Sequence, residues 1–448
     1  MGRRGAQEGD GVSARLRAAA HRLRLYLAPR IGRFVPAALK ARTRGWTALP
    51  EAGRAHVPYE PGADPEGVNL IGYLKAEMGL GQGARLYARA LEAAGLPHAL
   101  VSTAVGNASR HRDRTLDGRL SGQPVYNVDL VHVNAEQLPL LHAVLPKETW
   151  DRRYRIGVWL WELEDLPESW RGAFDLVDEV WTPSDFTTAA VAKVSPVPVR
   201  TVPYGVVAEP APGRTRASFG LPEDAFLFLS MYDARSFAAR KNPEGAVDAF
   251  LRAFGPEDLS VGLVVKANQA SRADLAALRR RIGSARNVRI VRGTLARGDV
   301  DALISCCDAV LGLHRSEGFG LVLAEAMLLG KPVVATGWSG NLEFMDEGTA
   351  CLVAYRLEPV GGAYPHAAPG ARWAEPDLDD AARWMRRLAT DAVFRARIAA
   401  AGQERIRRDF SPERSGERMR ARLAELGLLG GRDGAGAAAS EGKGAGTA

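Results

Sequence analysis

Short apolar runs alternate with longer amphipathic stretches along most of the chain, in two successive series. Runs of four to eight mostly apolar residues are typical of buried parallel strands, and the amphipathic stretches between them are typical of helices. The first series predicts strands at 68–73, 98–101, 128–134, 155–161 and 179–182, with helices at 84–94 and after Ser184. The second predicts strands at 226–231, 261–266, 288–291, 309–313, 332–336 and 350–353, with helices at 243–254 and 271–282.

This βαβ pattern indicates an α/β protein built from two Rossmann-like, doubly wound domains. A length of 448 residues also favours two domains over one core. We predict a basic extension at 1–65, an acceptor domain at 66–205, a donor domain at 206–400, a helical stretch at 401–429 and a disordered tail at 430–448. In doubly wound sheets, ligands bind outside the carboxyl ends of the strands, so the two domains should face a shared cleft.

The composition is that of a soluble globular protein, with 46% hydrophobic and 25% charged residues. No apolar run approaches the roughly 20 residues that a membrane span needs. The three cysteines lack metal-ligand spacing and are odd in number, which favours a reducing, cytoplasmic location.

The net charge of +7 belongs to one end of the chain. Residues 1–60 hold twelve Lys or Arg against four Asp or Glu, so the remainder is close to neutral. The segment 12–27 mixes Leu and Arg at near-helical spacing, and two interpretations stay open. It is either an amphipathic helix on the anionic inner face of a membrane or a solvated, partly disordered extension. It lacks the apolar region of a secretory signal, and we expect no nucleic-acid partner.

A motif after the predicted strand 309–313 carries the most specific chemistry. It places carboxylates at Glu317 and Glu325, and a helix should begin near residue 319 or 320 and stop at Gly330 before Pro332. The free amides of a first helical turn bind anions, so the motif suits a sugar diphosphate. The alternative is an ordinary βα unit whose acidic residues interact with the helix dipole. The candidate donor-binding residues here are His314, Gly318, Phe319, Gly320, Leu321 and Glu325.

This stretch resembles the E-x7-E signature of retaining GT-B glycosyltransferases. The resemblance is to family 4, glycosyl transferases group 1, which includes bacterial mannosyl- and glucosyltransferases of polysaccharide synthesis. Segments 339–345 and 373–377 resemble later landmarks of a subgroup, and the likeness runs from about residue 68 to 425. It implies transfer of a hexose from a nucleotide-diphosphate sugar to a glycan or lipid-linked acceptor. It also implies that Glu317 positions the sugar, that Glu325 holds the ribose and that the last helix crosses back to the first domain.

Three glycines, Gly79, Gly81 and Gly83, follow the first predicted strand. Glycines before a helix let backbone amides approach a phosphate closely. The pattern departs from G-x-G-x-x-G and no acidic residue follows at the right distance, so a redox dinucleotide is not expected. The resemblance implies that the loop with Gly79 and Gly81 closes over the diphosphate, and a simple tight turn is the alternative.

Two cations, Arg240 and Lys241, follow the strand 226–231, with Arg235 a further candidate donor contact. Cations at a strand end stabilise the charge of a departing diphosphate without a metal. The Asp-x-Asp triplets at 299–301 and 377–379 each open a predicted helix, where capping explains them. We therefore expect no metal and no cofactor, the nucleotide sugar being a co-substrate.

The other candidate positions are less specific. The resemblance suggests His132 as a catalytic histidine of the first domain, and places Thr294 and Leu295 in a loop that faces the base. Trp161 and Glu162, at the end of a predicted strand, are candidate acceptor contacts. A core histidine and a core tryptophan are the alternatives for His132 and Trp161.

The predicted reaction is front-face transfer with retention of anomeric configuration. Another class of function, a sugar-nucleotide-binding or assembly protein without turnover, uses the same fold, as would a phosphorylase or epimerase. The sequence leaves open the base (GDP, UDP or ADP), the sugar, the acceptor, the linkage and the oligomeric state.

Overall fold

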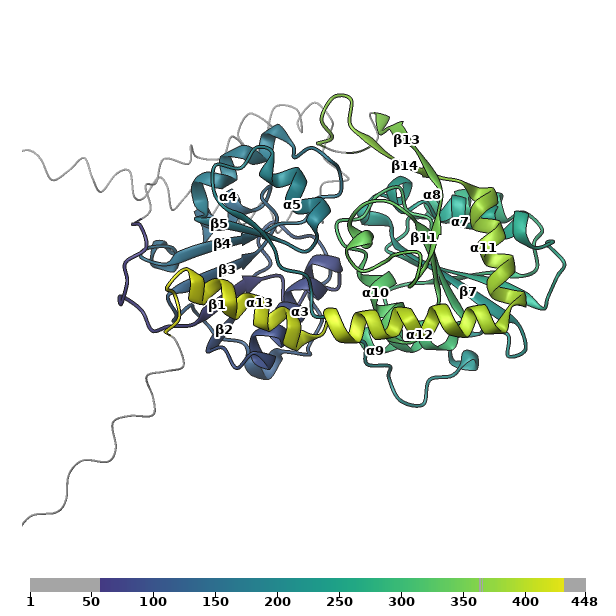
Figure 1. The fold of residues 1–448 in the computed structure, drawn as a ribbon, viewed down its shortest axis with the longest axis horizontal. Coiled ribbons are helices and arrows are strands. Elements are labelled where there is room, and N and C mark those ends of the chain that lie inside the picture. Colours follow the sequence, from purple (N-terminus) through teal and green to yellow (C-terminus); the bar gives the residue numbers. More distant parts are fainter. Residues whose placement is uncertain (1–56, 362–363, 365, 431–448) are drawn as a thin grey trace, which may run out of the picture.

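The computed structural model describes residues 57–361, 364 and 366–430. It confirms the predicted α/β class, because two six-stranded parallel sheets, each covered by helices, lie side by side (Figure 1). The predicted membrane-facing helix at 12–27 and nearly all of the predicted tail lie outside the described residues.

The first sheet has the strand order β2-β1-β3-β4-β5-β6, and each pair of neighbours is parallel. Its order reverses between β1 and β3, and such a reversal opens a crevice at the carboxyl ends of the strands. The strands are β1 (Val68–Gly72), β2 (His98–Ser102), β3 (Val128–His132), β4 (Tyr154–Val158), β5 (Glu179–Thr182) and β6 (Val199–Thr201). The helices of this domain are α3 (Gly79–Ala93), α4 (Leu138–Val144) and α5 (Asp185–Ala192), with 3-10 turns η3 (Asp117–Arg119), η4 (Lys147–Thr149) and η5 (Glu168–Leu176).

The second sheet has the order β12-β11-β10-β7-β8-β9 and is also parallel throughout. Its order reverses between β7 and β10, so the loops that follow these two strands meet above the sheet. The strands are β7 (Phe226–Asp233), β8 (Val261–Asn268), β9 (Val288–Arg292), β10 (Ala309–Gly312), β11 (Val333–Thr336) and β12 (Cys351–Val353). The helices are α6 (Ala238–Lys241), α7 (Pro243–Ala253), α8 (Arg272–Ile282), α9 (Arg297–Cys306), α10 (Leu321–Leu328) and α11 (Leu378–Thr390), with 3-10 turns η6 (Arg216–Phe219), η7 (Ala234–Ser236) and η8 (Gly340–Glu343).

Several local predictions are confirmed by the helix ends. Ser184 caps α5 by accepting a hydrogen bond from the Thr187 amide. Helix α10 begins after Gly320, which adopts a left-handed conformation (φ 94°), and the chain turns at Gly330 (φ 70°). The predicted start of the first helix at residue 84 is wrong, because α3 begins at Gly79 and all three glycines lie inside it.

An antiparallel hairpin that the sequence pattern did not predict extends from the second domain toward the first. It consists of β13 (Tyr355–Pro359) and β14 (Arg372–Pro376), and β14 carries the landmark segment at 373–377. Figure 1 shows the hairpin above the gap between the two sheets.

The last two helices, α12 (Ala392–Asp409) and α13 (Pro412–Glu425), join the domains. Helix α12 lies along the second domain, whereas α13 packs against α3 of the first (Figure 1). The contact is close, since a Cβ added at Gly416 would lie 2.3 Å from the Ala90 carbonyl oxygen. Arg422 of α13 forms a 2.7 Å ion pair with the buried carboxylate of Glu179 in β5.

The motif phenylalanine, Phe319, lies at the centre of the contact between the domains. Its ring packs edge-on against Tyr204, with 5.3 Å between ring centroids, and contacts Phe344 and Phe410. Tyr204 belongs to the segment that links the domains, and Phe410 lies between α12 and α13. The motif is therefore fixed to both points where the chain passes between the domains.

Candidate active site

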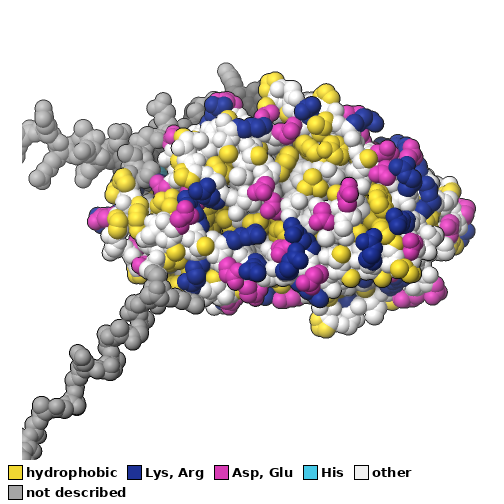
Figure 2. Space-filling model, viewed as in Figure 1, with side chains coloured by type: hydrophobic (Ala, Val, Ile, Leu, Met, Phe, Trp, Pro, Cys, Tyr) yellow, Lys and Arg dark blue, Asp and Glu magenta, His cyan; other side chains and the backbone are white. Residues whose placement is uncertain are grey.

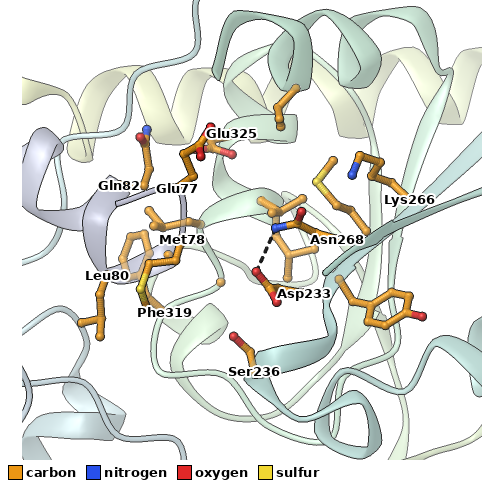
Figure 3. Close-up of a pocket in the computed structure, with 18 of the residues that line it drawn as sticks. Glu77, Met78, Leu80, Gln82, Asp233, Ser236, Lys266, Asn268, Phe319 and Glu325 are labelled. Atoms are coloured by element: carbon orange, nitrogen blue, oxygen red, sulfur yellow. Dashed lines mark hydrogen bonds between the residues drawn. The ribbon is translucent and has the colours of Figure 1, made fainter. Parts of the chain in front are cut away.

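A cavity of about 770 Å³ lies between the two domains and is lined by residues of both. It is bordered by the start of α3 on one side and by the loops after β7, β8 and β10 on the other. Figure 2 shows Lys and Arg side chains, with acidic side chains among them, near the middle of the face where the domains meet. Figure 3 shows Met78 and Leu80 entering from the first domain opposite Asp233, Asn268 and Lys266 of the second.

An ion-pair cluster joins the loop after β7 to the loop after β10. Lys241 Nζ lies 2.5 Å from Glu317 Oε1, and Arg240 lies 3.3 Å from Glu317 Oε2. Arg240 is buried and also donates to the carbonyl oxygen of Ser316 at 2.7 Å. The second domain therefore brings together three of the four predicted catalytic residues at one wall of the cavity.

The charges of this cluster determine the protonation of Glu317. Burial would raise the pKa of Glu317, but the positive charges of Lys241 and Arg240 outweigh it and lower the pKa to about 2. Burial lowers the pKa of Lys241 more than Glu317 raises it. Arg240 behaves differently, since Glu162 and Glu317 raise its pKa above the ordinary value despite burial. Glu317 is thus a carboxylate over the physiological pH range.

The start of α10 lies beside this cluster. The predicted donor-binding residues Gly318, Phe319, Gly320 and Leu321 all line the cavity. The amide of Glu317 donates to Ser339 Oγ at 2.8 Å, and the Gly340 amide donates to the Glu317 carbonyl at 2.9 Å. A Cβ at Gly340 would lie 2.3 Å from the Gly318 carbonyl oxygen, so only glycine lets the two loops pack this closely. The Leu323 amide donates to the Gly320 carbonyl, so among the described residues the amides of Leu321 and Val322 are left as donors for an anion at the start of α10.

Glu325, the second carboxylate of the motif, also lines the cavity and is fully buried. It lies 3.0 Å from Arg297, which also pairs with Asp301. Burial raises the pKa of Glu325 to about 7, although Arg297 opposes the shift. A carboxyl group held in this way presents hydrogen-bonding oxygens to hydroxyls, as the predicted ribose contact requires.

The opposite end of the cavity holds polar groups that suit a nucleobase. Thr294 Oγ1 donates to Asn268 Oδ1 at 2.9 Å, and Asn268 donates to Asp233 at 2.8 Å (Figure 3). Lys266 donates to the carbonyl of Gly293, and burial lowers its pKa to about 8. The predicted contacts Thr294 and Leu295 both line this end.

The three glycines of α3 have different surroundings. Gly79 lines the cavity, and a Cβ there would meet nothing within 4 Å. A Cβ at Gly81 would lie 2.2 Å from the Ala76 carbonyl oxygen, and one at Gly83 would lie 2.6 Å from Tyr204 Oη. Gly81 and Gly83 do not line the cavity, so close packing accounts for both.

Besides Gly81, three predicted site residues do not line the cavity. His132 is buried behind Tyr204, whose hydroxyl lies 3.1 Å from His132 Nε2, and burial lowers its pKa to about 4. Trp161 is buried and donates to the Asp165 carbonyl, and it packs on Trp170. Arg235 donates to the carbonyl of Ala108 in the first domain at 2.9 Å.

Glu162, in the loop after β4, does line the cavity, and it contacts both the β13–β14 hairpin and α6. Its carboxylate accepts a 2.7 Å hydrogen bond from Tyr364, between β13 and β14, and lies 3.5 Å from Arg240. Tyr364 had no signal in the sequence, because the hairpin that carries it was not predicted. Arg85, Arg112 and Arg297 also line the cavity and were not predicted, since charged residues on helices and loops are usually solvated.

Over the described part of the chain, no group of three or more His, Cys, Asp or Glu side chains is placed to hold a metal ion. Asp377 of one Asp-x-Asp triplet caps α11 by accepting from the amides of Asp379 and Asp380. In the other triplet, Asp301 pairs with Arg297 and accepts from the Glu209 amide. None of the helices in the same ranges has the length and apolar character needed to cross a membrane.

The similarities to known proteins agree with this geometry. Residues 235–359 match the family described as Glycosyl transferases group 1. The chain shares its fold with Anabaena HepE, solved in complex with UDP and glucose, at 16% identity and a TM-score of 0.57 over 80% of this chain and 100% of that one. Sucrose-phosphate synthase from Thermosynechococcus elongatus gives 17% identity and a TM-score of 0.58, over 83% and 99%. A glycosyltransferase from Rickettsia africae gives 13% identity and a TM-score of 0.55, over 81% of this chain and 98% of that one. No curated protein sequence matches the chain.

The matched segment and the fold support one enzyme class, a glycosyltransferase with the GT-B fold. The segment contains Arg240, Lys241, Glu317 and Glu325, all of which line the cavity. The activity that follows at this level is transfer of a glycosyl group.

Proposed function

We propose that this chain is a retaining, metal-independent hexosyltransferase of family 4. It moves a sugar of the mannose or glucose class from a nucleotide-diphosphate sugar to a hydroxyl of a glycan or lipid-linked acceptor, in polysaccharide synthesis. The observation that carries the proposal is the cluster of Lys241, Arg240 and Glu317 beside the amides of α10. The complex of HepE with UDP and glucose supports a nucleoside diphosphate and a hexose in such a cavity.

In the proposed step, the bond between the anomeric carbon and the β-phosphate oxygen breaks, and its electron pair stays on that oxygen. The acceptor hydroxyl forms its bond to the anomeric carbon on the same face and passes its proton to the departing oxygen. Lys241 and the amides of α10 stabilise the growing charge of the diphosphate. Arg240 holds the cluster together, and the walls that both domains give the cavity limit access of water.

Metal independence follows from the same cations. The diphosphate already carries two negative charges and gains a third as the bond breaks, until the acceptor's proton reaches the departing oxygen. Lys241 and Arg240 supply positive charge at the wall where the diphosphate would lie. Glu317, held ionised by these cations, accepts hydrogen bonds from the hydroxyls of the donor sugar.

The test is release of nucleoside diphosphate by the full chain from UDP-glucose, GDP-mannose and ADP-glucose. We expect release from one of them, unchanged in EDTA, and stabilisation of the protein by the matching nucleotide in a thermal-shift measurement. Early NMR spectra of the sugar transferred to an alcohol should show the anomer of the donor. Inversion, or a requirement for Mn²⁺, would refute the corresponding part of the proposal. Tight binding of nucleotide sugars without release, whichever glycan or lipid-linked acceptor is offered, would favour the non-catalytic alternative.

A further inference from the structure

His314 stands directly after β10, three residues before Glu317, and lines the cavity. Its side chain is buried, with 2% of the residue exposed, and neither ring nitrogen has a hydrogen-bond partner among the residues that the structure describes. Its backbone is fixed, because Thr336 Oγ1 donates to the His314 carbonyl at 2.6 Å and the next amide, of Arg315, donates to the Arg240 carbonyl. A buried imidazole without partners costs free energy, so such a residue calls for an explanation.

His132 provides the contrast within the same chain. It is as deeply buried, but its Nε2 has a partner in Tyr204 and it does not line the cavity. Among the described residues, His132 keeps one bonded nitrogen and has no partner at Nδ1, away from the cavity, whereas His314 has no partner at either nitrogen and lines the wall of the candidate site.

The charge state of His314 restricts its possible ligands. Burial lowers its pKa to about 4, and Lys241 and Arg240 also disfavour a positive ring, while Glu317 favours one. The ring is therefore neutral near pH 7 and offers one N–H donor and one acceptor nitrogen. A phosphate oxygen only accepts hydrogen bonds, whereas a sugar hydroxyl both donates and accepts. The neutral ring therefore matches a hydroxyl better than it matches the diphosphate.

We propose that the imidazole of His314 hydrogen-bonds a hydroxyl of the transferred sugar and so helps to select which sugar the enzyme accepts. This inference rests on the proposed function and extends it. Glu317, on the same loop, accepts from the sugar's hydroxyls, and His314 is the neighbouring group able to donate as well. Selection of the base is left to other residues that line the cavity, such as Thr294 and Asn268.

The test compares His314→Phe, which keeps a flat ring without polar atoms, with the unaltered full chain. Titration calorimetry with UDP and UDP-glucose, and with GDP and GDP-mannose, measures nucleotide and nucleotide-sugar affinity separately. We expect at least a tenfold loss in kcat/KM for the preferred nucleotide sugar, with the affinity for the free nucleotide unchanged within twofold. His314→Gln, which retains one donor and one acceptor, should recover part of the loss.

His132→Phe is the matched control, because it removes an equally buried imidazole outside the cavity. It should leave the ratio of nucleotide-sugar to nucleotide affinity within twofold of the unaltered chain, whatever its effect on stability. An equal change of this ratio in both variants would overturn the assignment, as would a parallel loss of nucleotide affinity in His314→Phe. An unchanged kcat/KM in His314→Phe would refute the role of His314 and leave the proposed function standing. A full chain that binds none of these nucleotide sugars would refute both the proposed function and the role of His314.

Discussion

Lys241 and Glu317 lie 76 positions apart in the sequence, yet the ammonium of one is 2.5 Å from the carboxylate of the other. They follow β7 and β10, which pair side by side in the second sheet, so their loops meet at its carboxyl edge. The pair links the group proposed to stabilise the leaving diphosphate to the group proposed to hold the sugar.

Replacing either partner should lower turnover without unfolding the protein. Lys241→Met removes a cation at the developing charge, and we expect kcat to fall roughly 10²–10³-fold. Glu317→Gln should cost a similar factor, and the double variant should lose much less than the product of the two, because the residues act as one unit. Steady-state release of nucleoside diphosphate measures all three, with circular dichroism to check folding.

Arg252→Met is the control for loss of a cation, since Arg252 pairs with the exposed Asp379 on the surface. Its kcat should stay within twofold of the unaltered chain. Additive losses in the double variant would contradict the assignment of one shared role.

Two neighbouring glycines of α3 should respond oppositely to alanine. Gly81→Ala forces a Cβ against the Ala76 carbonyl at 2.2 Å, and we expect about 1–3 kcal/mol of lost stability. Gly79→Ala meets nothing within 4 Å and has no positive φ, so it should leave stability unchanged or raise it by about 0.5 kcal/mol. Urea unfolding compares the two, and equal losses would contradict the close packing of Gly81 against the Ala76 carbonyl.

Acid should destabilise the protein partly through His132. Its pKa is about 4 when folded, against about 6.5 when unfolded, so the unfolded state binds the proton first as pH falls. The contribution of the neutral His132 ring to the free energy of unfolding is complete above pH 6.5 and is lost progressively toward pH 4. The loss between pH 7 and pH 5 amounts to about 2 kcal/mol. His132→Phe should remove that part of the slope of unfolding free energy against pH.

The comparison must be made between variants, because other groups act in the opposite sense. Burial raises the pKa of Asp129 and of Glu325 to about 7, so these carboxyls bind protons in the folded state first and gain stability as pH falls. Identical slopes for His132→Phe and the unaltered chain would contradict the assignment to His132.

The ion pair between Arg422 and Glu179 should matter greatly for stability. Glu179 is fully buried and also accepts from Trp181 Nε1 at 2.8 Å. Arg422→Met leaves this carboxylate without its cation, and we expect a loss of about 3–5 kcal/mol in urea unfolding. Adding Glu179→Gln should recover part of it, whereas Arg414→Met, which removes an exposed pair with Glu417, should cost under about 0.5 kcal/mol.

The strands were largely predictable because parallel strands buried on both faces appear as continuous apolar runs, as in Phe226–Asp233 and Val261–Asn268. The start of α3 was not predictable from the sequence, since glycine has low helix propensity. Tertiary contacts of Gly81 and Gly83 hold that turn instead. The hairpin β13–β14 was missed for a different reason. Its first strand does alternate Tyr355 and Leu357 with Arg356 and Glu358, but over only five residues, none of which is fully buried.

The site was predictable where function follows from position in a sheet. Lys241 and Glu317 lie in the segments that follow the neighbouring strands β7 and β10, so their meeting follows from topology. Arg297 and Tyr364 reach the site, or a residue lining it, only through contacts far apart in the sequence, and no local pattern reveals them. For His132, strand periodicity gives a face of the sheet but leaves open whether the side chain reaches the cavity.

The chain passes between the domains twice, and the two passages touch. The Val206 amide donates to the Phe410 carbonyl at 2.7 Å, and a Cβ at Gly205 would lie 2.5 Å from Pro412 Cα. Two backbone segments in contact at the junction resist twisting and sliding of the domains more than they resist bending. The cleft should therefore open by a hinge rotation about these two connections. The largest displacement should occur at the edge of the cleft farthest from them, where the β13–β14 hairpin meets the first domain.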